Sequence, residues 1–343
     1  MSRVVVRSLL LLAALASAPE TFAADGTPAT EDFKVPASDP GIQLHLHNKH
    51  PAVAGPNLRR HVVLFVHGAT FPASSTFDVA LPGPDSTHVS WMDELARQGF
   101  DVYALDIRGY GGSTRPPAMS QPPEANAPFA RAADAVRDIG AAVDFILARR
   151  KSRGITLIGW SWGTTTTAAY AAEQPDKVRA LVLVSPVWLG VQPPQYRGAY
   201  RTSTRESARA FAIAGIPRDR IDEIAPPASF DAWWTATLAT DPEGARQTPP
   251  VVRSPNGVLQ DFKELWAAGK PNYDPAKILA PTLLLVGEWD VVTPPAMAQG
   301  LFTQLSNARE RRLIQFSEAT HFLIIEKHRM RLIREVQNFL DER

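Results

Sequence analysis

The sequence Gly-Trp-Ser-Trp-Gly at residues 159–163 decides how the rest of the chain is interpreted. It follows the apolar run 155–158 and precedes residues 164–172, which are rich in small side chains. This order predicts a strand, a one-residue corner and a helix. A serine on such a corner adopts a strained backbone conformation, and the flanking glycines allow strand and helix to come close. We therefore expect the hydroxyl of Ser161 to project from the edge of a sheet.

The same corner places the backbone amide of Trp162 at the N-terminus of the predicted helix. Partial positive charge at a helix N-terminus stabilises an oxyanion that develops beside it. The pattern G-x-S-x-G is short and also arises by chance, so alone it does not identify a nucleophile. Catalysis by Ser161 requires that the rest of the chain supply a base, an acid and a second oxyanion donor.

The composition is that of an ordinary globular protein with room for a large core. The chain has 343 residues, of which 45% are hydrophobic and 21% are charged. Its net charge of +1 creates no field that would attract nucleic acid or an acidic partner. The sequence contains no cysteine, which excludes a thiol nucleophile, a disulfide and a thiolate metal site.

The start of the chain has the pattern of a secretory signal peptide. Arg3 and Arg7 give it positive charge, residues 8–16 are apolar, and small residues suited to cleavage follow. The apolar run is too short to span a membrane comfortably, and no stop-transfer charges follow it. We therefore expect cleavage after Ala23 or Ala24 and export to the periplasm or the exterior, without a stable membrane anchor.

Residues 25–47, which follow the expected signal peptide, predict one strand. Residues 25–40 are rich in Pro, Ala, Asp and Thr and predict a lead-in with little order. Residues 42–47 alternate apolar and polar side chains, which predicts a half-exposed strand. His45 and His47 share one face of it, but no carboxylate cluster accompanies them in the sequence. We interpret them as a polar strand face rather than as a metal site.

A second oxyanion donor is suggested by the sequence after the next strand. The continuous apolar run 62–66 predicts a buried, parallel strand, and it ends in His67-Gly68-Ala69-Thr70. A glycine directly after a central strand permits a turn that points an amide into a site. The amide of Ala69 is therefore the candidate second donor, and we expect His67 to brace the loop rather than act as a base.

Strands and helices then alternate along the chain. Helical patterns occur at 90–98, with Ser90 as the cap, and at 130–150, and apolar strands at 100–105 and 179–186. This alternation predicts a parallel sheet covered by helices on both faces. Asp106 and Arg108 follow the strand 100–105, and we interpret them as residues that brace a turn.

The alternation stops at residue 187. Residues 187–275 contain no comparable apolar strand but are rich in aromatic residues, which predicts a helical cap inserted over the site. We expect most of these aromatic side chains to pack between cap and core, and a few to face the pocket and favour an apolar or aromatic substrate. The aromatic residues are Trp188, Tyr196, Tyr200, Phe211, Trp233, Trp234, Trp266 and Tyr273.

The sheet resumes with the apolar strand 282–286, which is followed by Glu288 and Asp290. A helix at 295–305 and a strand at 312–316 come next, and the latter leads to His321. The final helix is predicted at 326–340.

The order of these parts resembles the α/β-hydrolase superfamily, in the cap-bearing branch with prolyl aminopeptidases, epoxide hydrolases and small-molecule esterases. The resemblance covers about residues 42–343 and implies a mostly parallel central sheet, helices on both faces and an inserted helical cap. It rests on five motifs at strand ends: His67-Gly68, Asp106-x-Arg108-Gly109-x-Gly111-x-Ser113, the Ser161 corner, Asp290 and His321. The expected division is a signal peptide at 1–24, a core at 25–186 and 276–343, and a cap at 187–275.

The family order of nucleophile, acid and histidine implies a triad of Ser161, Asp290 and His321. In this resemblance His321 takes the proton of Ser161, and Asp290 holds the imidazole tautomer and stabilises its charged form. The amides of Trp162 and Ala69 would form the oxyanion hole.

Two residues compete for these roles. Glu288 lies near the same strand end as Asp290, but Asp290 matches the family position that begins the loop. His328 is the rival histidine, and it falls inside the predicted last helix, where a surface role is expected.

Serine at the corner argues against the chemistry of haloalkane dehalogenases and epoxide hydrolases, whose members carry aspartate there. Prolyl aminopeptidases resemble the chain around Ser161 and Asp106, but they continue with Gly-Pro-Gly where this sequence has Ala69-Thr70. That departure alters the loop that shapes the acyl side of the pocket, so the resemblance to the peptidases is weaker there.

We therefore predict a serine hydrolase that cleaves a carboxylic ester of a small or medium apolar or aromatic substrate through an acyl-enzyme. No metal, organic cofactor or nucleic-acid partner is expected. Amide or peptide cleavage like that of prolyl aminopeptidases, lactone hydrolysis and carbon–carbon hydrolysis use the same triad and stay open as alternatives. A noncatalytic binding protein on the same fold is disfavoured, because such proteins typically lose a triad member.

Overall fold

The apolar runs of the sequence form the buried strands of one sheet. The computed structural model describes residues 27–52, 61–82, 88–190 and 195–343. The expected signal peptide at 1–24 lies outside the described residues. No helix in the described ranges is long and apolar enough to cross a membrane.

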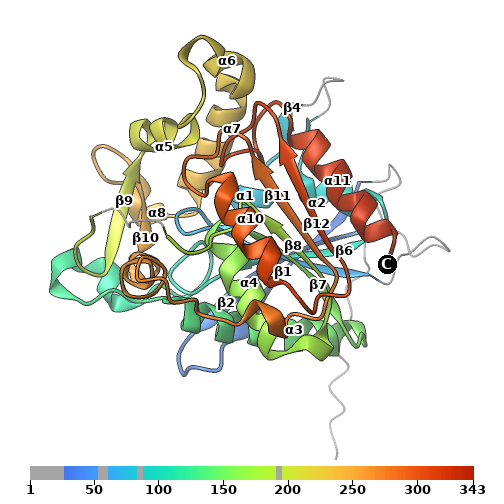
Figure 1. The fold of residues 1–343 in the computed structure, drawn as a ribbon. Helices are drawn as coiled ribbons and strands as arrows, with labels where there is room; N and C mark the ends of the chain where they lie inside the picture. The colour runs from blue at the N-terminus through green and yellow to red at the C-terminus, as the bar shows by residue number, and fades with distance from the viewer. Residues whose placement is uncertain (1–26, 53–60, 83–87, 191–194) are drawn as a thin grey trace, which may run out of the picture.

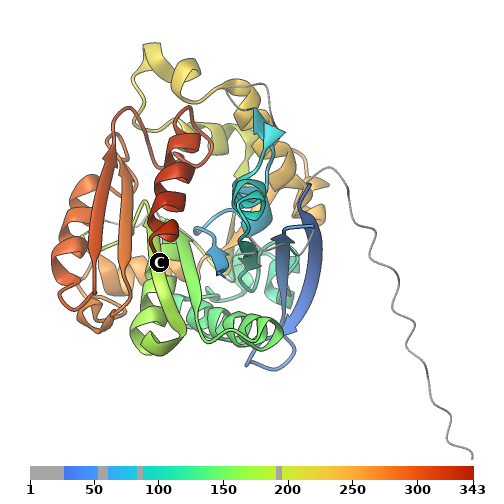
Figure 2. The same cartoon turned by 90° about the vertical axis from the view of Figure 1, so that its right-hand side faces the viewer.

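Eight strands lie in the order β1, β2, β6, β3, β7, β8, β11, β12, with β1 at one edge and β12 at the other (Figures 1 and 2). From β6 to β12 in this order neighbouring strands run parallel, whereas β1 and β2 pair antiparallel. The strands are β1 (Ala29–Pro36), β2 (Gln43–His50), β3 (Val62–Val66), β6 (Asp101–Asp106), β7 (Ile155–Trp160), β8 (Val178–Val184), β11 (Thr282–Gly287) and β12 (Arg311–Phe316). The predicted mostly parallel sheet is confirmed.

Alternate side chains of each central strand enter two different cores, because successive side chains of a strand point to opposite faces. Leu64 and Val66 belong to the same buried cluster as side chains of helices α3, α4 and α10, whereas Val63 and Phe65 belong to the cluster that includes α1, α2 and α11. These helices are α1 (Ala73–Phe77), α2 (Trp91–Arg97), α3 (Ala132–Arg150), α4 (Trp162–Glu173), α10 (Pro295–Gln304) and α11 (Arg329–Asp341). Helices therefore cover both faces of the sheet, as predicted, and Ser90 caps α2 through a capping box.

The prediction of little order for residues 25–40 is wrong where the structure describes them. β1 pairs with β2 from Ala29 to Pro36. Val35 is buried, and the Phe33 ring packs on the core with its centroid 5.3 Å from that of Phe145. The polar composition of the segment concealed these two alternate apolar side chains.

Between β8 and β11 the chain leaves the sheet and lies at the end to which the arrow of β11 points (Figure 1). The described part of this inserted segment holds α5 (Arg205–Ala212), α6 (Ile221–Ile224), α7 (Pro227–Ala239), α8 (Pro242–Ala245) and α9 (Gly257–Asp261). It also holds an antiparallel pair, β9 (Tyr200–Thr204) and β10 (Val251–Pro255), which we call the ribbon. The expected purely helical cap missed this ribbon, because β9 is polar and carries no apolar run.

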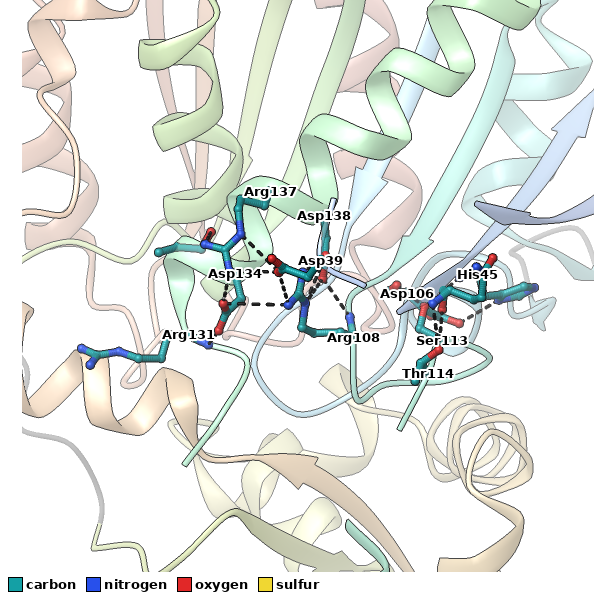
Figure 3. Close-up of polar contacts among 12 residues, drawn as sticks. Asp39, His45, Asp106, Arg108, Ser113, Thr114, Arg131, Asp134, Arg137 and Asp138 are labelled. Atoms are coloured by element: carbon teal, nitrogen blue, oxygen red, sulfur yellow. Dashed lines mark hydrogen bonds and ion pairs between the residues drawn. The ribbon is translucent and has the colours of Figure 1, made fainter. Parts of the chain in front are cut away.

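The turn after β6 is braced by a buried ion pair (Figure 3). The Arg108 guanidinium donates to both carboxylate oxygens of Asp138 on α3, with Nη2 to Oδ1 at 2.5 Å and Nε to Oδ2 at 3.0 Å. The backbone amide of Arg108 donates to the same carboxylate at 3.1 Å, and Asp138 is fully buried. The predicted role of Arg108 as a turn-bracing residue agrees with this geometry.

We expect Asp138→Ala to lower the free energy of unfolding by about 3 kcal/mol, because Arg108 loses its fully buried counter-ion and keeps only the partly exposed carboxylates of Asp39 and Asp134. Urea unfolding followed by tryptophan fluorescence measures this change. The matched control is Asp144→Ala on the same helix, where an exposed carboxylate pairs with Lys177. That variant should lose less than about 1 kcal/mol. Equal losses in the two variants would contradict a structural role for the buried pair.

Candidate active site

The corner predicted at Ser161 is present between β7 and α4. Ser161 has φ 55° and ψ −124°, a conformation that residues other than glycine rarely adopt. A Cβ on Gly163 would lie 2.2 Å from the Val66 carbonyl oxygen, and one on Gly159 would lie 2.4 Å from the Gly163 carbonyl oxygen. Both flanking positions therefore require glycine, because strand β3, strand β7 and helix α4 meet there without room for a side chain.

The three residues predicted to form a triad come together at this corner. The Ser161 Oγ lies 2.9 Å from Nε2 of His321, and Nδ1 of His321 lies 3.0 Å from Oδ2 of Asp290. Ser161 is 8% exposed, and His321 and Asp290 are each 2% exposed. If Nδ1–H of His321 donates to the carboxylate, Nε2 is free to accept the hydroxyl proton of Ser161.

The surroundings of Asp290 favour its charged form. Burial by itself would raise the pKa of Asp290, but the charge and hydrogen bond of His321 and donors on Thr293 outweigh it and hold the pKa below the usual value. The Thr293 hydroxyl donates to Oδ2 at 2.8 Å, and the amides of Val292 and Thr293 donate to Oδ1 at 2.9 and 2.8 Å. An ionised Asp290 can stabilise an imidazolium at His321.

The backbone around His321 is fixed from two sides. Trp160 Nε1 donates to the His321 carbonyl oxygen at 3.0 Å. The carboxyl of Glu326, which is 2% exposed, accepts from the Thr320 amide at 3.0 Å and from the Thr320 hydroxyl. These bonds hold the loop between β12 and α11, which carries His321, against the end of the sheet.

Burial raises the pKa of Glu326 to about 7, and hydrogen bonds from Thr320 only partly oppose this shift. The folded state then binds a proton at Glu326 more tightly than the unfolded chain does. Stability is therefore expected to fall as pH rises from about 4.5 to 7, by about 3 kcal/mol in total.

Glu326→Gln should remove this titration while keeping the shape of the side chain. The free energy of unfolding of the variant relative to wild type should therefore rise between pH 5 and pH 8. Urea unfolding at four pH values in this range measures the difference, with the exposed Glu173→Gln as control. Parallel pH profiles for wild type and Glu326→Gln would show that Glu326 does not titrate in this window.

The candidate oxyanion donors lie on either side of Ser161. Trp162 is the first residue of α4, and a Cβ on Gly68 would lie 3.1 Å from the Ser161 Cβ, which places the Ala69 loop beside the serine. Neither the amide of Trp162 nor that of Ala69 donates to another residue in the described part of the chain. Both amides are thus available to a substrate oxygen.

Three side chains hold the carbonyl groups of the loop Ala69–Thr70. The Ala69 carbonyl oxygen accepts from the Tyr110 hydroxyl at 2.7 Å and from Nη2 of Arg201 at 2.6 Å. The Thr70 carbonyl oxygen accepts from the Ser254 hydroxyl at 2.7 Å. Arg201 and Ser254 belong to the ribbon, so the inserted segment helps to set the conformation of this loop.

His67 and Asp106 brace the loops that follow β3 and β6, as predicted. Nδ1 of His67 donates to the Gly68 carbonyl oxygen at 2.6 Å, Nε2 accepts from the Ile107 amide at 3.1 Å, and burial lowers the pKa of the ring. Asp106 accepts from the Ala73 and Gly112 amides at 2.8 and 3.0 Å and contacts His45 (Figure 3). His67 has no ring nitrogen left for Ser161.

The rival acid and histidine lie away from this cluster. Glu288 accepts from the Glu318 amide at 3.2 Å. His328 immediately precedes α11, rather than lying within it as predicted, and its Nε2 is 3.9 Å from a Glu318 carboxylate oxygen. Among the described residues neither side chain forms a hydrogen bond or ion pair with Ser161, His321 or Asp290, which leaves Asp290 and His321 as the partners of Ser161.

His45 and His47 lie beside carboxylates that their sequence context did not reveal. His45 lies 2.8 Å from both Asp106 and Asp32, and His47 lies 2.8 Å from Asp32 and 2.9 Å from Asp78. Across the described ranges, no group of three or more His, Cys, Asp or Glu side chains has an arrangement that could hold a metal ion. The two histidines are part of a network of ion pairs between β1, β2 and their neighbours.

A cavity of about 340 Å³ opens onto Ser161 and His321. Most of its wall is apolar, and the ribbon and α5 contribute hydroxyl groups and one cation. The lining residues are Ala69, Thr70, Phe71, Trp160, Ser161, Trp162, Val187, Arg201, Thr202, Ser203, Ser207, Ala208, Phe211, Leu259, Phe262, Val292, Thr293 and His321. Of the eight cap aromatics named from the sequence, only Phe211 lines this cavity.

Comparison with known proteins agrees with this architecture. The family described as the alpha/beta hydrolase fold matches residues 61–328. The chain belongs to the alpha/beta hydrolase family. No curated protein sequence matches the chain.

Solved structures of several hydrolases share the fold. A thermophilic esterase from Thermogutta terrifontis is 18% identical, with 91% of this chain and 98% of that chain covered and a TM-score of 0.60. A serine hydrolase involved in carbazole degradation is 19% identical, with coverage of 92% and 100% and a TM-score of 0.61. The 2-hydroxy-6-oxo-6-phenylhexa-2,4-dienoate hydrolase from Rhodococcus sp. strain RHA1 is 18% identical, with coverage of 91% and 99% and a TM-score of 0.55. At these identities the likeness is one of fold.

Sequence reasoning missed four residues that support the site. Thr293 binds Asp290, Glu326 holds the residue before His321, and Arg201 and Ser254 hold the Ala69 loop. Only Thr293 could have been suspected from the sequence, because it lies three residues after Asp290. The contacts of Arg201 and Ser254 join segments that are distant in the chain, and Glu326 lies six residues after Thr320 in a loop that no periodic pattern marks.

Proposed function

We propose that the protein is a serine hydrolase that cleaves a carboxylic ester of a small or medium apolar or aromatic substrate through an acyl-enzyme. The observation that carries the proposal is the chain of two short contacts from Ser161 Oγ through His321 to Asp290 at the wall of the cavity. This arrangement of nucleophile, base and acid is suited to acyl transfer.

In the proposed reaction the hydroxyl of Ser161 attacks the ester carbonyl while Nε2 of His321 takes its proton. The amides of Trp162 and Ala69 donate to the oxyanion of the tetrahedral intermediate. The imidazolium, stabilised by Asp290, then gives its proton to the departing alkoxide, which leaves as an alcohol. Water, deprotonated by the same imidazole, then attacks the acyl-enzyme, and the imidazolium returns its proton to the oxygen of Ser161 as the acid leaves.

The cavity favours an ester over the amino-terminal substrate of a prolyl aminopeptidase. Its wall contains the cation Arg201 and no aspartate or glutamate among the described lining residues. A protonated amino terminus would therefore meet a like charge and find no carboxylate to bind it. Lactone and carbon–carbon hydrolysis use the same groups and are the remaining alternatives to ester cleavage.

Ser161→Ala should lower turnover of a p-nitrophenyl ester by a factor on the order of 10⁴ to 10⁶, because no other group can form the acyl-enzyme. A fluorophosphonate probe should label Ser161 in the wild type, as peptide mass mapping would detect. Label on a different serine, or unchanged turnover in Ser161→Ala, would remove the proposed nucleophile.

Asp290→Asn should also slow turnover strongly while the thermal unfolding midpoint stays close to that of wild type.

A panel of p-nitrophenyl esters of rising chain length, beside proline and alanine p-nitroanilides, tests the reaction type. We expect ester turnover to exceed anilide turnover and to be highest for short and medium acyl chains that fit about 340 Å³. Faster cleavage of proline p-nitroanilide than of every ester would instead favour the peptidase alternative.

Export is proposed on the sequence of the first 24 residues alone. The protein produced from the full chain should accumulate outside the cytoplasm. N-terminal sequencing should then find a mature start directly after Ala23 or Ala24.

A further inference from the structure

One charged side chain, that of Arg201, lines the cavity, and no step of the proposed reaction uses its charge. Arg201 lies on β9, is half-buried, and lines the same cavity as Ser161 and His321. A cation in such a place affects which substrates bind, because charges act strongly where water is partly excluded.

The guanidinium of Arg201 is held in one orientation by uncharged oxygens. Nη1 donates to the Pro255 carbonyl oxygen at 2.7 Å and to Oδ1 of Asn256 at 3.3 Å. Nη2 donates to the Ala69 carbonyl oxygen at 2.6 Å and to the Thr70 hydroxyl at 3.0 Å. These contacts use the four N–H groups of the two terminal nitrogens and leave the Nε–H as the remaining donor.

None of these contacts neutralises the charge of Arg201. Within the described ranges no carboxylate forms an ion pair with it, whereas buried Arg108 pairs with Asp138 and buried Arg253 pairs with Asp241. Burial holds the pKa of Arg201 below its usual value, yet an arginine keeps its proton at neutral pH.

Other arginines of the described chain, among them Arg115, Arg311 and Arg329, also bind mainly carbonyl groups, and these three do not line this cavity. Arg329 donates to the Leu81 and Pro82 carbonyl oxygens, and Arg115 donates to those of Gly111 and Thr240. A guanidinium on neutral acceptors can therefore be purely structural in this fold. What distinguishes Arg201 is its position in the wall of the cavity beside Ser161.

Thr70 adds a second donor next to this charge. Its hydroxyl oxygen accepts from Arg201, and its own hydroxyl proton goes to no acceptor in the described part of the chain. Thr70 also lines the cavity. Among the described residues, the Thr70 hydroxyl and the Nε–H of Arg201 are both donors without an acceptor, on two residues that line the cavity beside a positive charge. Donors next to a cation suit a carboxylate.

We propose that Arg201 and Thr70 bind a carboxylate of the substrate, so that the protein acts on carboxylic esters that carry a second, ionised carboxyl group. The inference rests on the proposed ester hydrolysis and names its substrate class. The apolar remainder of the cavity holds the hydrocarbon part, and the substrate charge neutralises Arg201 when the complex forms.

Matched pairs of esters that differ only in this charge test the proposal. On the acyl side the pair is p-nitrophenyl hydrogen adipate and p-nitrophenyl hexanoate. On the alcohol side the pair is 4-acetoxybenzoate and its methyl ester. In at least one pair, wild type should show a kcat/KM for the anionic ester that is at least about tenfold higher, after subtraction of the uncatalysed rate.

Three variants separate the charge of Arg201 from its support of the Ala69 loop. Arg201→Met loses both and should bring the anionic-to-neutral ratio of kcat/KM to about 1. Ser254→Ala loosens the same loop without a charge change, so it should slow both esters and keep the ratio. Arg201→Lys keeps the charge and should retain most of the preference.

The outcomes distinguish this inference from the proposed function. Absence of hydrolysis of all four esters, together with absence of fluorophosphonate labelling, would refute the serine hydrolase itself. Hydrolysis of the neutral esters with no preference for either anionic ester would overturn the carboxylate site and leave the hydrolase intact. A preference that persists in Arg201→Met, or that disappears equally in Ser254→Ala, would also overturn it.

Discussion

The close contact of helix α4 with strands β3 and β7 is the constraint on which the site depends. Gly159 and Gly163 leave no room for a side chain between these elements, and Ser161 is forced into positive φ where the chain reverses. The hydroxyl consequently stands at the ends of parallel strands. Loops after β11 and β12 leave the sheet at this same edge, which brings Asp290 and His321 to the serine over more than a hundred residues of sequence.

The sequence allowed much of this to be predicted because the relevant signals are local. Apolar runs bounded by glycine mark the central strands, and each candidate site residue follows one of them directly. Ser161 was a candidate from its own corner motif, whereas Asp290 and His321 were chosen through the resemblance to the family order of nucleophile, acid and histidine. The amides of Trp162 and Ala69 were candidates on local grounds, because one begins the helix after Ser161 and the other follows the glycine turn after the strand 62–66.

The remainder depends on contacts between distant segments, which no local pattern records. β1 was missed because two apolar side chains, Phe33 and Val35, support it within a polar stretch. β9 was missed because it pairs with β10, some fifty residues away, and has no apolar run of its own. Arg201 and Glu326 look like surface charges in the sequence, and only the fold shows which groups surround them.

The anchoring of the Ala69 loop by Arg201 and Ser254 means that the inserted segment is not an interchangeable module. A chimera that carries the insertion of another family member would lose two of the three side chains that fix the loop, even if its own helices folded well. Sequence changes in the inserted segment are therefore constrained by the Ala69 loop of the core, which two of its side chains hold. A change of substrate range in this lineage must preserve those two donors or replace them with others that reach the same carbonyl groups.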